Sequence, residues 1–150
     1  NSEFIDSNGN SLKKSIFDIC KPYNGNDSRH FLFENCVSGH TILFKKSLKK
    51  YLVNFPNGIF YDQWIAYVAT NIGSINYIED KLVKFRRHEE NSTDILRQKK
   101  RIRNQNNEIN KIESFAKFAF NKNDFAKRLF NLTKKRINYI NLELLYFLIN

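Results

Sequence analysis

Glycine, proline, cysteine and methionine are scarce in this chain of 150 residues, which has 5 Gly, 2 Pro, 2 Cys and no Met. Neither a GxGxxG fingerprint nor a GxxxxGK[ST] loop is present, so the two common glycine-rich phosphate cradles are excluded. The cysteines Cys20 and Cys36 cannot build a disulfide framework, so we expect reduced, buried thiols in a cytoplasmic protein. Because the chain begins at Asn1 without a methionine, we expect the natural start to lie upstream.

Long apolar runs are also missing. None approaches the ~20 residues that a membrane-spanning helix needs. The longest run, residues 142–149, is short and interrupted by Glu143. No signal-peptide pattern is visible. We therefore expect a cytoplasmic location, with the inner face of the membrane as the alternative.

Basic residues are plentiful, with 25 Lys+Arg against 15 Asp+Glu and a net charge of +10. Such a balance suits an anionic partner, namely nucleic acid, anionic lipid or a phosphate-bearing substrate. Residues 84–103 alone hold eight Lys or Arg and three acids. Richness in Lys and Asn also follows from an AT-rich genome, so the total charge alone does not choose among these partners.

Two regions differ in amino-acid composition, because all Gly, Pro and Cys residues precede residue 92. The first region alternates strand-like and helix-like patterns, which predicts an α/β layered domain over 1–93. The second region predicts a helical extension over 94–150. The expected strands are 3–5, 37–44, 74–78 and 82–85, with a turn at 6–10, and the expected helices are 28–34, 46–51, 62–71, a long one capped at Ser92 or Thr93, one starting at 123–124, and 137–149.

Asp62 lies where a helix is expected to open. A carboxylate there accepts backbone N–H bonds, stays ionised and can serve as a general base. The alternative interpretation is a plain helix cap, with Tyr61 and Trp64 as core aromatic residues.

Two further places carry candidate residues. His88, after the expected strand 82–85, could ligate a metal, while Arg86 and Arg87 could pair with diphosphate oxygens. A solvated surface histidine is the alternative, and the lack of a close second ligand argues against a zinc site. Gly39, between a loop and an expected strand, would let the backbone approach a ligand that His40 could also contact, unless it is simply a turn glycine.

These segments follow one another in an order that resembles family 2 glycosyltransferases. The matching stretches are 35–46 (NCVSGHTILFKK), 55–64 (FPNGIFYDQW), 73–78 (GSINYI) and 82–91 (LVKFRRHEEN), preceded by 4–9 (FIDSNG). The match of each stretch alone is weak, but together the stretches cover about residues 1–94. The resemblance implies a partial GT-A (nucleotide-diphospho-sugar transferase) α/β domain followed by the helical extension.

The resemblance also implies roles. Asp62 would be the catalytic base that takes a proton from the acceptor hydroxyl, with inversion at the anomeric carbon. His88 would help to hold a divalent metal, Mg or Mn, on the diphosphate. Gly39 would line the donor and acceptor cleft, and Trp64 would pack behind Asp62. The implied substrate-binding set is Gly39, His40, Trp64, Arg86 and Arg87.

Two departures limit what this chain would do alone. The family's nucleotide-binding half and its Asp-x-Asp motif lie upstream of the matching stretches, and Tyr61 stands where an acid is common. The resemblance therefore implies a fragment that is inactive by itself. Its whole enzyme would use a nucleotide-sugar donor and a saccharide or lipid-linked acceptor, in cell-surface polysaccharide synthesis. Residues 97–150 would offer peripheral membrane contact.

A different class of function competes with this one. Residues 97–103 (RQKKRIR) form a basic cluster that could contact nucleic-acid phosphates. No recognised nucleic-acid-binding motif accompanies it, so a basic binding module is the second hypothesis.

Overall fold

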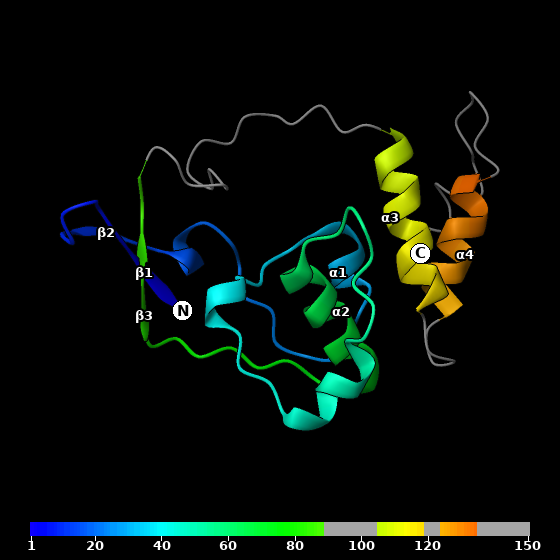
Figure 1. The fold of residues 1–150 in the computed structure, drawn as a ribbon, viewed down its shortest axis with the longest axis horizontal. Coiled ribbons are helices and arrows are strands. Elements are labelled where there is room, and N and C mark those ends of the chain that lie inside the picture. The colour runs from blue at the N-terminus through cyan, green and yellow to red at the C-terminus, as the bar shows by residue number, and fades with distance from the viewer. Residues whose placement is uncertain (89–104, 119–123, 135–150) are drawn as a thin grey trace.

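A computed structural model describes residues 1–88, 105–118 and 124–134 of the chain. A small sheet lies at one end and a group of helices at the other (Figure 1). The elements in chain order are β1 (Ser2–Ile5), β2 (Ser11–Ser15), η1 (Ile16–Asp18), α1 (His30–Phe33), η2 (Gly39–Thr41), η3 (Lys46–Tyr51), α2 (Tyr61–Ile72), β3 (Val83–Arg86), α3 (Gln105–Lys117) and α4 (Asp124–Lys134), where η marks a 3-10 helix.

The sheet has the order β2-β1-β3. β1 and β2 are antiparallel and joined by the expected turn, in which Asp6 N–H donates to the Asn10 carbonyl at 2.9 Å and Gly9 has a φ of 91°. β1 and β3 are parallel, with Ser2 opposite Val83. Parallel strands need a long crossover, and here that connection carries α1 and α2. The described residues thus combine a mixed sheet with helices, and the GT-A assignment itself stays a prediction.

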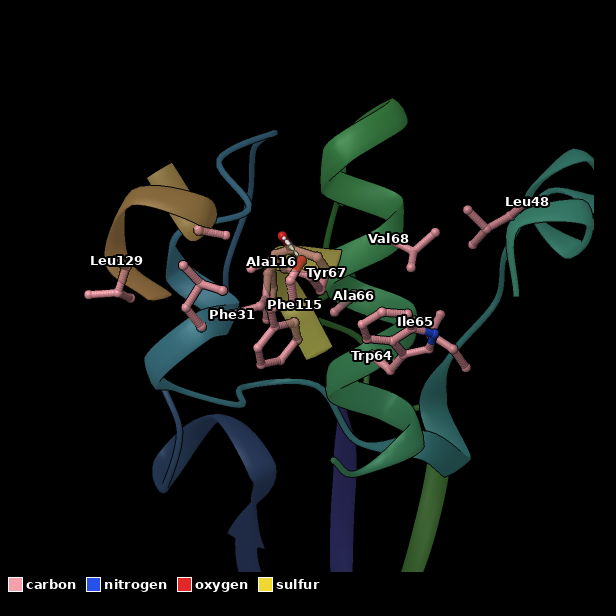
Figure 2. Close-up of a cluster of buried hydrophobic side chains, with 12 residues drawn as sticks. Phe31, Leu48, Trp64, Ile65, Ala66, Tyr67, Val68, Phe115, Ala116 and Leu129 are labelled. Carbon is pink, nitrogen blue, oxygen red and sulfur yellow. Dashed lines mark hydrogen bonds between the residues drawn. The ribbon is translucent and has the colours of Figure 1, made fainter. Parts of the chain in front are cut away.

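The main hydrophobic core surrounds α2. Trp64 and Tyr67 are fully buried, pack against Phe115 of α3, and belong to the same cluster as Phe31 of α1 and Leu129 of α4 (Figure 2). The Tyr67 hydroxyl donates to the Phe115 carbonyl at 3.0 Å, and burial raises the pKa of Tyr67 to about 12. The described part of the helical extension therefore shares its core with the region before residue 92.

Several expectations are confirmed. β1 and β3 lie within one residue of their predicted bounds, η3 matches 46–51, and α4 begins at Asp124. α2 follows the predicted helix and ends at Gly73, as expected. The helix start at 92–93, the basic cluster 97–103 and the segment 137–149 lie outside the described residues.

Two predicted strands are wrong. Within 37–44 the backbone instead forms η2, because the Ser38 carbonyl accepts both the backbone N–H and the hydroxyl of Thr41, at 2.9 and 2.8 Å. Such local bonds compete with a strand ladder. Segment 74–78 makes only an isolated bridge between Ile75 and Gly25. The edge strand β2 was not predicted.

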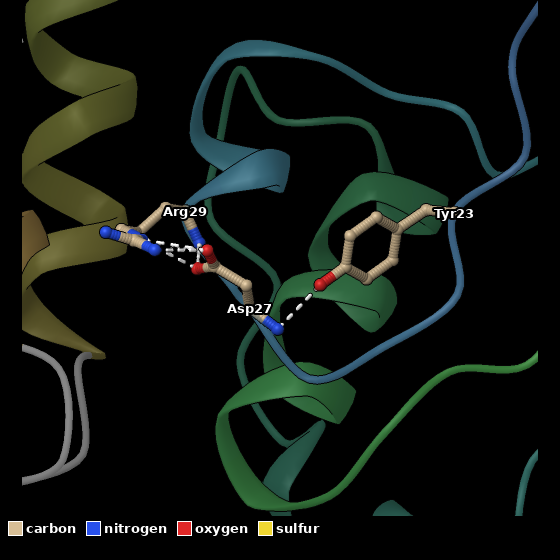
Figure 3. A network of polar contacts seen from close by, with 3 residues as sticks. All are labelled: Tyr23, Asp27 and Arg29. Carbon is tan, nitrogen blue, oxygen red and sulfur yellow. Dashed lines mark hydrogen bonds and ion pairs between the residues drawn. The ribbon is translucent and has the colours of Figure 1, made fainter. Parts of the chain in front are cut away.

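The helix expected over 28–34 is shorter, at His30–Phe33. Asp27 precedes it and accepts from the Arg29 backbone N–H at 2.9 Å and from the Arg29 guanidinium at 2.6 Å (Figure 3). The Tyr23 hydroxyl accepts from the Asp27 backbone N–H at 2.6 Å. The Arg29 guanidinium holds the pKa of Asp27 below its usual value. Because this pair is exposed, it orders the loop more than it stabilises the fold.

None of the helices among the described residues is both long enough and apolar enough to span a membrane.

Candidate functional site

Asp62 lies in the first turn of α2, beside the loop that contains η2. Its Oδ1 accepts from the Gln63 backbone N–H at 2.8 Å and from the Asn35 side-chain amide at 2.9 Å. The helix cap is Phe60, whose side chain makes no capping bond, so the alternative interpretation of Asp62 as a plain helix cap is wrong by two residues. A carboxylate in the first turn still benefits from the positive end of the helix dipole.

Asn35 fixes the orientation of Asp62. Its Oδ1 accepts from the Val37 backbone N–H at 3.1 Å, while its Nδ2 donates to Asp62. Both ends of the amide are thus engaged, one in the local turn and one at the carboxylate. The sequence analysis gave Asn35 no role. Its place as the first residue of the family-like stretch 35–46 was the one indication of a function.

His40 connects η2 to the sheet. Ser38 Oγ lies 2.9 Å from His40 Nδ1, and Ser2 Oγ lies 3.3 Å from His40 Nε2. The imidazole stacks on Phe85 of β3, with ring centroids 4.5 Å apart. Burial lowers the pKa of His40, and the negative charge of Asp62 opposes that shift. The Asp62 carboxylate thus acts on the His40 ring electrostatically.

Gly39 is needed for a steric reason. A Cβ atom added at Gly39 would lie 1.8 Å from the Tyr61 hydroxyl oxygen, inside any van der Waals contact. Gly39 thus lies against the side chain of Tyr61, the residue before Asp62. Contact between Gly39 and a ligand stays a prediction.

Trp64 does not face the site. Its side chain is 0% exposed, and its ring packs on Phe115 and Phe118 with centroids 5.8 and 4.7 Å away. The implied packing behind Asp62 agrees with this burial, whereas the predicted direct contact with substrate is wrong because a fully enclosed ring has no ligand-facing surface. Among the described residues no partner accepts the buried Trp64 Nε1–H.

Arg86 is the last residue of β3 and Arg87 follows it, and successive side chains of an extended chain point to opposite sides. Arg86 Nη1 donates to the carbonyls of Asp6 and Ser7, at 3.1 and 2.6 Å, and so clamps the turn between β1 and β2. Arg87 lies over the Phe85 ring, 5.7 Å from its centroid, on the face that His40 also uses. Arg87 is therefore the better placed of the two for a phosphate, and substrate contact by either stays a prediction.

His88 is the second residue after β3 and is exposed. In the described ranges, no three or more His, Cys, Asp or Glu side chains gather closely enough to hold a metal ion. The metal role of His88 stays a prediction.

Comparison with known proteins gave no significant match, whether to a protein-family model, a curated protein or a solved structure. The resemblance to family 2 glycosyltransferases thus rests on the order of the short stretches and on the site that they form.

Proposed function

We propose that this chain is the acceptor-side part of an inverting glycosyltransferase that uses a nucleotide-sugar donor, with Asp62 as the general base. The observation that carries the proposal is the convergence of two family-like stretches. Residues 35–46 and 55–64 meet at Asp62, where Asn35 orients the carboxylate and Tyr61 packs on Gly39. Neither contact could be predicted from the spacing of neighbouring residues along the chain.

The geometry suits proton removal. Both contacts of the half-exposed Asp62 carboxylate go to Oδ1, and in the part of the chain that the structure describes Oδ2 has no recorded partner. Oδ2 can accept the proton of an acceptor hydroxyl as that oxygen attacks the anomeric carbon. The bond to the nucleoside diphosphate breaks on the opposite side, which inverts the configuration. A Mg or Mn ion near His88, when bound, would neutralise the leaving diphosphate.

Exposed aromatic rings support a saccharide as the acceptor. Phe60 and Tyr61, beside Asp62, are 55% and 56% exposed. Sites for organic ligands commonly combine aromatic surface with a few fixed polar groups, and the rings here adjoin an oriented carboxylate. A saccharide or lipid-linked sugar in cell-surface polysaccharide synthesis would present both an apolar ring face and a hydroxyl.

The test is sugar transfer by the full-length protein that contains this sequence. A panel of nucleotide-sugars is supplied with saccharide and lipid-linked acceptors, and nucleoside diphosphate release is measured. Asp62→Asn removes the base, so kcat should fall by about 10²–10⁴-fold. Asp80→Asn, which changes an exposed carboxylate in the loop before β3, should keep normal transfer. Unchanged transfer by a folded Asp62→Asn protein would contradict the assignment, and absence of transfer from every donor would contradict the proposed class.

A further inference from the structure

The two cysteines of the chain lie together. Cys20 follows η1 and Cys36 follows α1, and both are free and half-buried. Each thiol is the largest influence on the pKa of the other, which requires the two sulfurs to lie close together. Cys20 Sγ also lies 3.7 Å from the carbonyl oxygen of Asn35, the residue before Cys36. The fold therefore brings two thiols from separate segments close together, and the expectation of buried thiols is wrong in that both are only half-buried.

A histidine stands beside the pair. His30 Nε2 lies 3.4 Å from Cys36 Sγ. The imidazole is held by Tyr23, on which it stacks with ring centroids 4.6 Å apart. A fixed imidazole at hydrogen-bond distance can take the proton of the Cys36 thiol when that sulfur becomes a nucleophile.

We propose that Cys20 and Cys36 form a redox-active thiol pair that closes to an intramolecular disulfide by exchange with a low-molecular-weight disulfide. The Cys20 thiolate attacks one sulfur of the small disulfide, which gives a mixed disulfide and releases one small thiolate. Cys36 then loses its proton to His30 and attacks the Cys20 sulfur. The Cys20–Cys36 bond forms, and the second small thiolate leaves. The protein loses two electrons and two protons, and the small disulfide becomes two thiols.

The order of attack follows from the contact between the sulfurs. The hydrogen bond from Cys36 holds the pKa of Cys20 below its usual value, although partial burial opposes this. The same contact, together with burial, raises the pKa of Cys36. At neutral pH Cys20 has the larger thiolate fraction, so it attacks first and Cys36 resolves the mixed disulfide.

The pair adjoins the Asp62 site. Asn35 contacts Cys20 through its carbonyl and Asp62 through its side chain, at 3.7 and 2.9 Å. Closing the disulfide replaces the thiol contact at the Asn35 carbonyl. The Asn35 side-chain amide should therefore change its NMR resonances on oxidation, whether or not the chain belongs to a transferase.

The experiment uses the whole reduced chain with glutathione disulfide under anaerobic conditions, followed by acid quenching, alkylation and intact mass measurement. The expected product is a monomer that has lost both alkylatable thiols and retains no glutathione. Cys36→Ser should stop at a glutathione adduct on Cys20, and Cys20→Ser should react more slowly. Retention of glutathione on both cysteines, a disulfide-linked dimer, or two thiols that stay fully alkylatable would each overturn the proposal.

A second measurement needs no cysteine variant to fold. The wild-type chain is treated in the same way in urea, where only chance encounters bring the sulfurs together. The fraction that closes without retained glutathione should be lower in urea than in buffer. Equal fractions in the two solvents would mean that the fold does not pair the thiols, and the proposal would fail.

Discussion

The inward face and the first turn of α2 belong to one helix, yet different physics organises them. On the inward face, Trp64 and Tyr67 are fully buried in a cluster that also holds side chains from α1, α3 and α4. In the first turn, Asp62 is half-exposed and oriented by a single amide from Asn35. The core depends on summed apolar area and volume, whereas the site depends on a few point contacts. The two regions should therefore respond differently to substitution.

The largest expected effect is on the core side. Trp64→Ala removes a fully buried indole, and the cavity left behind should lower the free energy of unfolding by about 3–5 kcal/mol. The control Phe60→Ala truncates a 55% exposed ring on the same helix and should cost within about 0.5 kcal/mol. Urea denaturation measures both. Similar costs for the two variants would show that the core is not centred on α2.

The next largest effect is expected at Gly39, where η2 packs against the first turn of α2. Gly39→Ala places a methyl group 1.8 Å from the Tyr61 hydroxyl oxygen, so the loop or the ring must shift. Because the Tyr61 ring is 56% exposed and can move, the cost should lie at the low end of overpacking, about 1 kcal/mol. Adding Tyr61→Ala should remove most of that loss, because it removes the clashing ring.

Gly73→Ala is the matched control for the glycine. Its added Cβ would lie 3.7 Å from the Ala69 carbonyl oxygen, an ordinary contact. The change should leave the free energy of unfolding nearly unaltered. If Gly39→Ala is equally neutral, or if Tyr61→Ala does not rescue it, the packing of η2 against α2 is wrong.

A smaller effect is the pH dependence contributed by His40. The pKa of His40 in the folded chain is below its unfolded value of 6.5, mainly because of burial. The unfolded chain therefore binds more protons in that range. The stability contributed by neutral His40 is fully present above pH 6.5 and is lost as the pH falls through the folded pKa.

His40→Gln isolates that contribution, since glutamine does not titrate. The difference in unfolding free energy between the wild type and His40→Gln should shrink as the pH is lowered from about 8 to about 5. Urea denaturation at a series of pH values measures it. A difference that grows on acidification would mean that the fold stabilises protonated His40.

Local patterns predicted the core better than the site. α2 was predictable because its apolar residues and Gly73 signal a helix and its end. β2 was missed because its sequence, Ser-Leu-Lys-Lys-Ser, has one apolar residue and is held by backbone bonds to β1. An edge strand of this kind carries no hydrophobic alternation.

The contacts of the site could not be predicted from the sequence where they join residues that are far apart along the chain. The clamp of Arg86 on Ser7 and the bond from Asn35 to Asp62 join residues that no local spacing connects. The strand expected at 37–44 does not form, because the Thr41 hydroxyl donates a local hydrogen bond to the Ser38 carbonyl. Candidate residue types could be chosen from the sequence, but their partners depend on the tertiary fold.

The central claim is that Asp62 and His40 share one site, and an NMR titration of the His40 ring tests it most directly. The resonance is assigned with His40→Gln, and the wild type is compared with Asp62→Asn and with the control Asp80→Asn. Because the Asp62 carboxylate raises the pKa of His40 against the effect of burial, Asp62→Asn should lower that pKa further, and Asp80→Asn should leave it unchanged. A His40 pKa that is the same in wild type and Asp62→Asn, or higher in the variant, would contradict the account.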